Sequence, residues 1–117
     1  MAITRKEFLR LGTLGLMGAV GLALSSVAGA RKQRTKTVVI QNFSFKPAHI
    51  TIERGTRVRW INKDSVKHTA TANNGRSFDS GLLRKGQRYS HTFKRAGKKP
   101  YHCEPHPDMK GSVTVKR

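Results

Sequence analysis

Beyond residue 36, apolar and polar side chains alternate along the chain with a period of two residues. Within residues 56–62, Val58 and Trp60 fall on one face, while Arg57 and Arg59 fall on the other. This alternation is typical of a half-buried β-strand, because successive strand residues point to opposite faces. We predict strands over residues 37–41, 49–53, 56–62, 89–93 and 112–115.

Turn-forming residues separate these predicted strands, and no segment beyond residue 30 carries the apolar stripe of an amphipathic helix. Short strands separated by turn signals indicate an all-β fold. We therefore predict a β-sandwich with Greek-key connections over residues 37–117. The turn signals are Arg54-Gly55, Asn73-Asn74-Gly75, Lys85-Gly86, Ala96-Gly97 and Lys110-Gly111.

The first 30 residues have a different composition. Residues 1–10 are basic, and residues 11–30 contain no charged side chain and end in Ala28-Gly29-Ala30. A basic start, an apolar run and a small-x-small end predict an export signal. An uncleaved membrane anchor is the alternative, because about 20 apolar residues can span a bilayer. Residues 4–10 also resemble the twin-arginine export motif, with Lys6 in place of its second arginine.

The chain has 117 residues and is strongly basic, with 24 Lys and Arg against 6 Asp and Glu and a formal net charge of +18. Its length predicts one domain, and residues 31–36 are expected to form a basic, flexible lead-in to it. The single cysteine, Cys103, excludes an intrachain disulfide and any site that needs two thiolates of one chain. An unpaired thiol in an exported protein needs a reason, such as burial or a bound metal.

One segment before the last predicted strand combines three soft metal-ligand types. Cys103, His106 and Met109 follow one another at intervals of three residues. Zinc sites are built from Cys, His and carboxylates, and hard cations prefer oxygen. Copper fits a thiolate, imidazoles and a weak axial thioether. The spacing therefore predicts a copper site on one loop, which requires a second histidine from elsewhere in the chain.

Three histidines upstream are candidates for that second imidazole: His49, His68 and His91. We choose His68, because it follows the predicted strand 56–62 in a loop that a sandwich brings to the same end as the last strand connection. His91 lies in the middle of a predicted strand, where a structural role is expected, and His49 precedes a strand near the other end. His102 is adjacent to Cys103, so in an extended chain it points to the opposite face.

With these residues in place, the chain resembles the cupredoxins, the small blue-copper proteins, and within them the amicyanin and plastocyanin type. The two-residue gaps on either side of His106 match the short ligand loop of amicyanins. The resemblance implies copper ligands at His68, Cys103, His106 and Met109, with His106 as the exposed ligand and electron port. It covers essentially the whole chain beyond the N-terminal segment. The matching segments are Val58–Asn62 followed by His68, Phe78–Leu83 and Tyr101–Met109.

Two residues depart from the family pattern. Thr69 follows the first histidine ligand, where many members have an asparagine that ties the two ligand loops together. We expect Thr69 to tie them less rigidly. Asp108 stands where amicyanins carry an apolar residue, so the surface around the exposed histidine is expected to be less hydrophobic and locally more acidic.

The resemblance implies a one-electron carrier that shuttles between redox partners by Cu(II)/Cu(I) cycling, and not an enzyme. No metal position is left for a substrate, and no acid–base pair or nucleophile accompanies the motif. A periplasmic copper-binding or chaperone protein is the alternative, but such sites are often rich in Met, and Met109 is the one methionine beyond residue 30. A copper enzyme such as a nitrite reductase would need further histidines for a second copper site.

The basic charge has two interpretations. It is either a solvated surface without a specific role or a means of steering toward a partner with an acidic docking face, such as a c-type cytochrome, an oxidase or a dehydrogenase. Attraction to anionic lipid headgroups is a further option. Nucleic-acid binding is disfavoured by the export signal and by the lack of a nucleic-acid-reading motif. We expect a monomer in the periplasm or at the outer face of the cytoplasmic membrane.

Overall fold

The computed structural model describes residues 33–117. The export signal or anchor that we predict over residues 1–30 lies outside the described residues, as does the start of the basic lead-in. Within residues 33–117, no helix is long and apolar enough to cross a membrane. The strands are β1 (Thr35–Gln41), β2 (Ser44–Lys46), β3 (His49–Glu53), β4 (Thr56–Asn62), β5 (Thr71–Ala72), β6 (Arg88–Phe93), β7 (Gly97–His102) and β8 (Lys110–Lys116).

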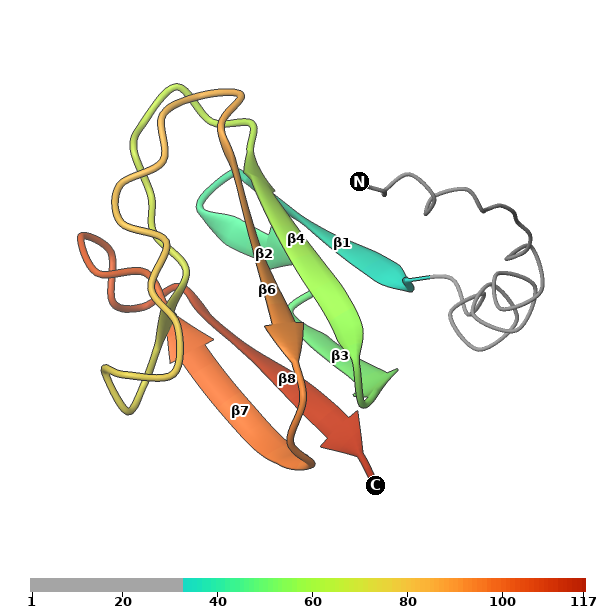
Figure 1. The fold of residues 1–117 in the computed structure, drawn as a ribbon. Helices are drawn as coiled ribbons and strands as arrows, with labels where there is room; N and C mark the ends of the chain where they lie inside the picture. The colour runs from blue at the N-terminus through green and yellow to red at the C-terminus, as the bar shows by residue number, and fades with distance from the viewer. Residues whose placement is uncertain (1–32) are drawn as a thin grey trace, which may run out of the picture. The chain divides into compact units, whose positions relative to one another are not determined.

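These strands form two four-stranded sheets that pack as a sandwich (Figure 1). One sheet has the order β2-β1-β4-β6 and the other the order β3-β8-β7-β5. The pairs β1–β4 and β3–β8 are parallel, so the chain crosses between the sheets before it returns beside an earlier strand. The remaining pairs are antiparallel. The predicted all-β sandwich is confirmed.

Each of the five predicted strands is present, and two of them match the observed bounds. β1 begins two residues earlier than expected, so Thr35 and Lys36, which we assigned to the lead-in, pair with β4. β7 was not predicted from the sequence, because Lys98, Lys99 and Pro100 give this segment no alternation of apolar and polar residues. β2 and β5, with three and two residues, are too short to show a period.

The core lies between the sheets and is centred on Trp60. The side chains of β4 alternate between buried and half-buried positions, as the sequence pattern predicts. Trp60 is fully buried, stacks on Phe78 with ring centroids 5.4 Å apart, and meets Tyr101 edge-on at 5.4 Å. Such aromatic pairs add to the stabilisation from burial. The core thereby links β4, the long β5–β6 connection and β7.

The close packing at Tyr101 explains a glycine in β8. A Cβ on Gly111 would lie 2.5 Å from the Tyr101 hydroxyl oxygen and 2.7 Å from the Ala48 carbonyl oxygen. Burial raises the pKa of Tyr101 to about 12, and the neighbouring Trp60 indole partly offsets this rise. Because a Cβ at position 111 would collide with Tyr101 and Ala48, β8 can pass these two residues only with a glycine.

Asn62, the last residue of β4, organises the loops at one end of the sandwich. It is fully buried, and its side-chain amide donates hydrogen bonds to the carbonyl oxygens of Val66 (2.9 Å) and Leu83 (2.8 Å). Its side-chain oxygen accepts the Asp64 N–H at 2.9 Å. One asparagine thus shapes the β4–β5 loop and joins it to the β5–β6 connection. The candidate site lies in these loops.

Candidate metal centre

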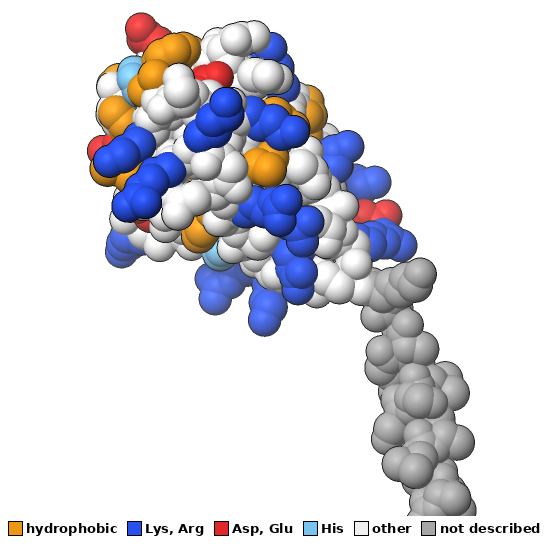
Figure 2. All heavy atoms as spheres, turned by 90° about the horizontal axis from the view of Figure 1, so that it is seen from above, with side chains coloured by type: hydrophobic (Ala, Val, Ile, Leu, Met, Phe, Trp, Pro, Cys, Tyr) orange, Lys and Arg blue, Asp and Glu red, His pale blue; other side chains and the backbone are white. Residues whose placement is uncertain are grey.

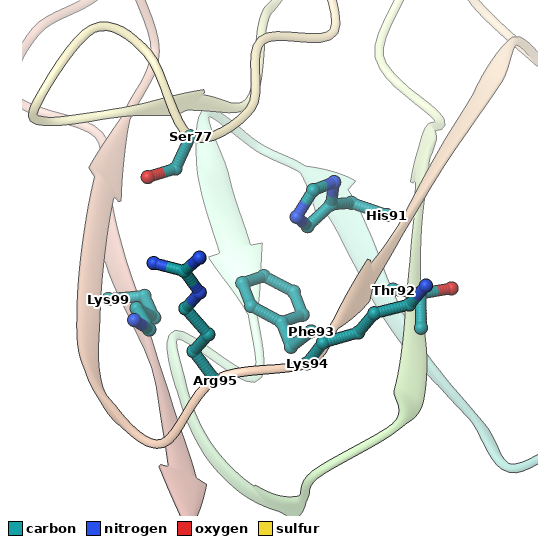
Figure 3. A pocket seen from close by; sticks show the side chains of 7 residues that line it. All are labelled: Ser77, His91, Thr92, Phe93, Lys94, Arg95 and Lys99. Atoms are coloured by element: carbon teal, nitrogen blue, oxygen red, sulfur yellow. The ribbon is translucent and has the colours of Figure 1, made fainter.

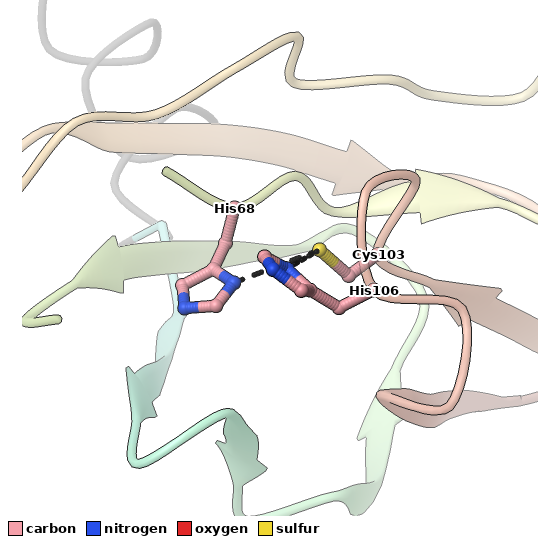
Figure 4. Close-up of side chains that lie close together, drawn as sticks. All are labelled: His68, Cys103 and His106. Atoms are coloured by element: carbon pink, nitrogen blue, oxygen red, sulfur yellow. Dashed lines mark hydrogen bonds between the residues drawn. The ribbon is translucent and has the colours of Figure 1, made fainter. Parts of the chain in front are cut away.

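Three of the predicted ligands converge at this end of the sandwich. The ligand atoms of His68, Cys103 and His106 all lie within 4.8 Å of one another (Figure 4). Cys103 Sγ is 3.7 Å from His68 Nδ1 and 3.6 Å from His106 Nδ1. His68 and Cys103 are fully buried, whereas His106 is half-buried. His68 therefore lies beside a loop that begins 35 residues further along the chain.

His68 is held at its backbone and at the far side of its ring. Its N–H and C=O pair with Leu83 across an isolated β-bridge. Its Nε2 lies 2.8 Å from Asp64 Oδ2, so the proton of a neutral ring sits on Nε2 and the Nδ1 lone pair faces the sulfur. A carboxylate behind a ligating histidine is a common means of fixing the ring orientation.

Asp64 joins the histidine to a second loop. Its two carboxylate oxygens also accept the backbone N–H groups of Asn42 (2.8 Å) and Phe43 (2.9 Å) in the β1–β2 turn. Desolvation by burial raises the pKa of Asp64, but these two N–H donors and His68 together outweigh it, so the net pKa is lowered. Asp64 is ionised at neutral pH and supports His68 as a charged hydrogen-bond acceptor.

The loop from Cys103 to Met109 is closed by its own backbone. Cys103 N–H donates to the Met109 carbonyl oxygen (3.1 Å), and Met109 N–H donates to the His106 carbonyl oxygen (2.9 Å). Pro105 and Pro107 restrict the backbone on both sides of His106. The Met109 side chain is buried, 5 % exposed, at the end of this loop. The loop is therefore compact and pre-shaped around its histidine.

The donor spacing fits a metal ion better than a direct contact. Bond lengths of about 2.3 Å to sulfur and 2.0 Å to imidazole nitrogen are usual for a divalent ion such as zinc. In a trigonal plane they give a sulfur–nitrogen separation of about 3.7 Å, close to the 3.6 and 3.7 Å observed. Two imidazoles and one thiolate are the planar donor set of blue-copper sites.

A comparison with protein families agrees with this donor set. The model of the copper-binding proteins of the plastocyanin/azurin family matches residues 33–116, which is nearly all of the described chain. The chain belongs to that family. It is a cupredoxin, and the metal of its centre is copper.

Individual relatives point the same way. The amicyanin of Paracoccus versutus is 30 % identical over 97 % of this chain and 92 % of its own length. The amicyanin of Paracoccus denitrificans is 34 % identical over 67 % of this chain, but the match spans only 63 % of that protein. An oxidised mutant of amicyanin superposes with a TM-score of 0.66 at 30 % identity, covering 69 % of this chain and 81 % of the amicyanin.

A copper-containing nitrite reductase of Thermus scotoductus also contains a similar domain. It superposes with a TM-score of 0.68 at 29 % identity over 74 % of this cupredoxin. The match covers only 23 % of the reductase chain. The shared part is thus one domain of a much longer protein.

Thr69 ties the two ligand loops of this cupredoxin together. Its N–H points at Cys103 Sγ (3.4 Å), and its hydroxyl oxygen accepts the Glu104 N–H at 2.8 Å. The same hydroxyl lies 2.9 Å from that of Thr71, which donates to Asp79 Oδ1 at 3.1 Å. A chain of hydroxyl groups ending at a carboxylate therefore anchors Thr69. We expected Thr69 to tie the two ligand loops less rigidly than an asparagine would. In the structure, Thr71 and Asp79 extend the hydrogen bonding of Thr69.

The other histidines have different surroundings. His49 Nδ1 lies 2.8 Å from the Ser112 hydroxyl. His91 packs against Phe78 and Phe93, with ring centroids 5.2 and 4.8 Å away. His102 is hydrogen-bonded to Asn73 and Glu104. Each of these rings lies outside the ligand cluster.

Two residues of the centre were missed by the sequence analysis. Asp64 precedes His68 by four residues, and this spacing is the only signal that pointed to it. Phe43 lies far away in the sequence, yet its ring meets His68 and His106 edge-on at 5.1 and 4.9 Å. Asn42 and Phe43 both have a positive φ, of 53° and 55° respectively. A sequence pattern does not reveal this backbone conformation.

The large hydrophobic side chains that are exposed lie in the loops at the end of the sandwich that carries the centre. Phe43, Val66 and Leu82 are 49, 39 and 58 % exposed, and the Phe43 ring contacts His106. The face seen in Figure 2 shows hydrophobic side chains gathered beside a histidine, with Lys and Arg over the rest of it. Asp108 is exposed on the ligand loop.

Proposed function

We propose that this cupredoxin is a one-electron carrier and that His68, Cys103, His106 and Met109 are the copper ligands. The observation that carries the proposal is the cluster of one thiol and two imidazoles, of which only His106 reaches the surface. Copper, when bound, supplies a Cu(II)/Cu(I) couple. A thioether is a usual weak additional donor beside such a set, and buried Met109, which closes the same loop, would hold the metal as that donor.

The chain's own residues hold the donors in one arrangement. Asp64 orients His68, Thr69 supports the sulfur and the Glu104 backbone, and the two prolines restrict the backbone beside His106. Donors that move little between the two oxidation states keep the reorganisation on electron transfer small. Half-buried His106 is then the path by which an electron reaches a partner, while the other two donors stay shielded from water.

We expect reversible one-electron voltammetry from the copper-loaded protein, without turnover of nitrite or phenols. The rigid, buried donors should give a narrow, symmetric wave that persists over repeated cycles. Loss of copper during cycling would instead support a chaperone, because an exchangeable site releases its metal. Turnover of nitrite would contradict the carrier assignment, and a colourless Cu(II) complex would contradict the ligand set.

The surface around His106 suggests how a redox partner docks. Phe43, Val66 and Leu82 provide an apolar contact area, and exposed Lys67 and Lys85 lie beside it in the chain. We infer that an acidic redox protein docks here, with long-range attraction to the basic chain increasing its rate of encounter. We propose a monomer, which leaves this face free for the partner. The composition of the N-terminal segment is consistent with export to the periplasm.

We call Lys67 and Lys85 the basic margin. If this basic margin steers the partner, the rate of electron transfer from anionic hexacyanoferrate(II) should fall as the salt concentration rises. Lys67→Gln should lower the low-salt rate constant by more than Lys36→Gln, because Lys36 lies at the opposite end of β1 from the centre. Stopped-flow measurements over a range of ionic strength provide the comparison. Equal effects of the two substitutions would leave only the net charge, with no role for the margin around His106.

A further inference from the structure

A second feature of the molecule lies away from the metal centre, at the open side of the sandwich between β6 and β7. It is a cavity of about 290 Å³, near the lower end of the range for small-ligand pockets. Figure 3 shows the imidazole of His91 on one wall and the guanidinium of Arg95 turned inward between Ser77 and Lys99. Its lining residues are Ser77, His91, Thr92, Phe93, Lys94, Arg95 and Lys99.

A lysine and a histidine of this pocket occupy inward-facing strand positions, and burial lowers the pKa of His91, so that the positive charge comes from the lysines and Arg95. Residues two apart on a strand share a face, so Lys99 shares its face with buried Tyr101, and His91 shares its face with buried Phe93. Lys99 is half-buried, whereas its neighbours Lys98 and Pro100 are exposed. Inward positions of a sandwich are normally filled by apolar residues. Here a lysine and a histidine point between the sheets.

The unusual strand pairing leaves room for them. β5 pairs with β7 only at Tyr101 and His102, so the first half of β7 has no neighbour on that side. Gly97, the first residue of β7, adopts a φ of +131°, and a Cβ there would lie 3.6 Å from the Lys99 ammonium. The lysine therefore folds over the glycine into the pocket.

The positive charge of the pocket is not balanced by the protein. None of the seven lining residues is acidic. Among residues 33–117, the ion pairs are Arg34–Glu53, His68–Asp64 and His102–Glu104, and none of them reaches the pocket. Lys94 and Arg95 are exposed, whereas Lys99 is half-buried, and drawing this ammonium partly out of water costs free energy unless a counter-charge is present. Three neighbouring cationic side chains without an acidic partner in the lining therefore favour a negatively charged occupant.

The donors also suit an oxyanion. Ser77 Oγ accepts a hydrogen bond from the Asn74 side-chain amide (2.6 Å), which leaves its own proton available to donate. Arg95 offers a planar fork that matches phosphate oxygens, and Lys99 adds a point charge. We propose that this pocket binds a phosphate group, either as free phosphate or as a phosphate monoester. The site lies outside the copper centre and does not depend on the electron-carrier assignment.

A competing explanation is that these charges only protect an open strand edge. Inward-pointing lysines on edge strands prevent sheets from pairing with one another. That role requires no ligand, and it predicts that Lys99→Gln increases self-association without any change in phosphate binding. The two explanations therefore differ in a measurable way.

The test is a titration of the reduced, copper-loaded protein with inorganic phosphate at constant ionic strength, followed by the backbone amide signals in NMR spectra. We expect saturable shifts confined to the pocket residues, and weaker binding by at least fivefold in Arg95→Gln and Lys99→Gln. Lys98→Gln, which removes the same charge from the exposed face of β7, should change the affinity by less than twofold. A parallel titration with glycerol phosphate measures the affinity for a phosphate monoester. Whichever of the two ligands binds more tightly, inorganic phosphate or glycerol phosphate, indicates which form the pocket takes.

Shifts that do not saturate, or that spread over all basic surfaces, would overturn the proposal. Equal weakening in Lys98→Gln and Lys99→Gln would also overturn it, because general charge attraction would then explain the binding. Increased sedimentation of Lys99→Gln with unchanged phosphate affinity would assign the charges to edge protection instead.

Discussion

Replacing Cys103 by serine is expected to abolish the intense visible absorption of the copper-loaded protein. That absorption arises from charge transfer between a thiolate and Cu(II), and a serine hydroxyl supplies neither the ionised sulfur nor a soft donor. The copper dissociation constant should rise by more than the roughly 100-fold that is typical of losing an outer-shell support. The electronic spectrum and a competition titration with a copper chelator measure both effects.

The matched control for this substitution is His102→Gln. His102 is adjacent to Cys103 in the chain, but both of its ring nitrogens are hydrogen-bonded to other side chains. We expect this variant to keep the visible band and the affinity for copper. Cys103→Ser should still fold without metal, because the new hydroxyl also accepts the Thr69 N–H that now points at the sulfur. If the band survived Cys103→Ser, the donor set would have to be abandoned.

The Asp64→Asn variant is expected to weaken copper binding by about 10- to 100-fold, the usual effect of losing a carboxylate behind a metal-binding histidine. The Asp64 carboxylate accepts the His68 Nε2–H and the N–H groups of Asn42 and Phe43. An amide has one acceptor oxygen, so at least one of these donors loses its partner. We also expect a loss of stability of about 0.5–1.5 kcal/mol, the usual net contribution of one hydrogen bond, because the Asn42 and Phe43 N–H groups belong to exposed residues.

Asp108→Asn provides the control, because it removes the same charge close to the same centre from an exposed side chain. Chelator competition and thermal unfolding of the metal-free and copper-loaded forms separate an effect on the site from an effect on the fold. We expect the visible band of Asp64→Asn to shift or broaden as the His68 ring loses its fixed orientation. Copper affinities of the two variants within a factor of two would show that Asp64 contributes only its charge.

The fold could be predicted well because the strand pattern is strong where side chains alternate. Val58 and Trp60 face the core, and Arg57 and Arg59 face outward, so β4 was found with its observed bounds. β7 could not be found in this way, because its inner face carries Lys99 at the pocket and its outer face carries Lys98 and Pro100. It is a strand because it pairs with β8, and this long-range pairing outweighs its local pattern.

The sequence by itself indicated the donor chemistry that we propose for this cupredoxin, since a thiol, an imidazole and a thioether follow one another at spacings of three residues. It also favoured His68 over the other histidines from the order of strands and loops. Only the tertiary structure decided which residues support those donors, because Asp64, Phe43 and the Thr69–Thr71–Asp79 chain act through contacts between separate loops. The same is true of the basic pocket, whose residues become neighbours only when two sheets pack and leave one edge open.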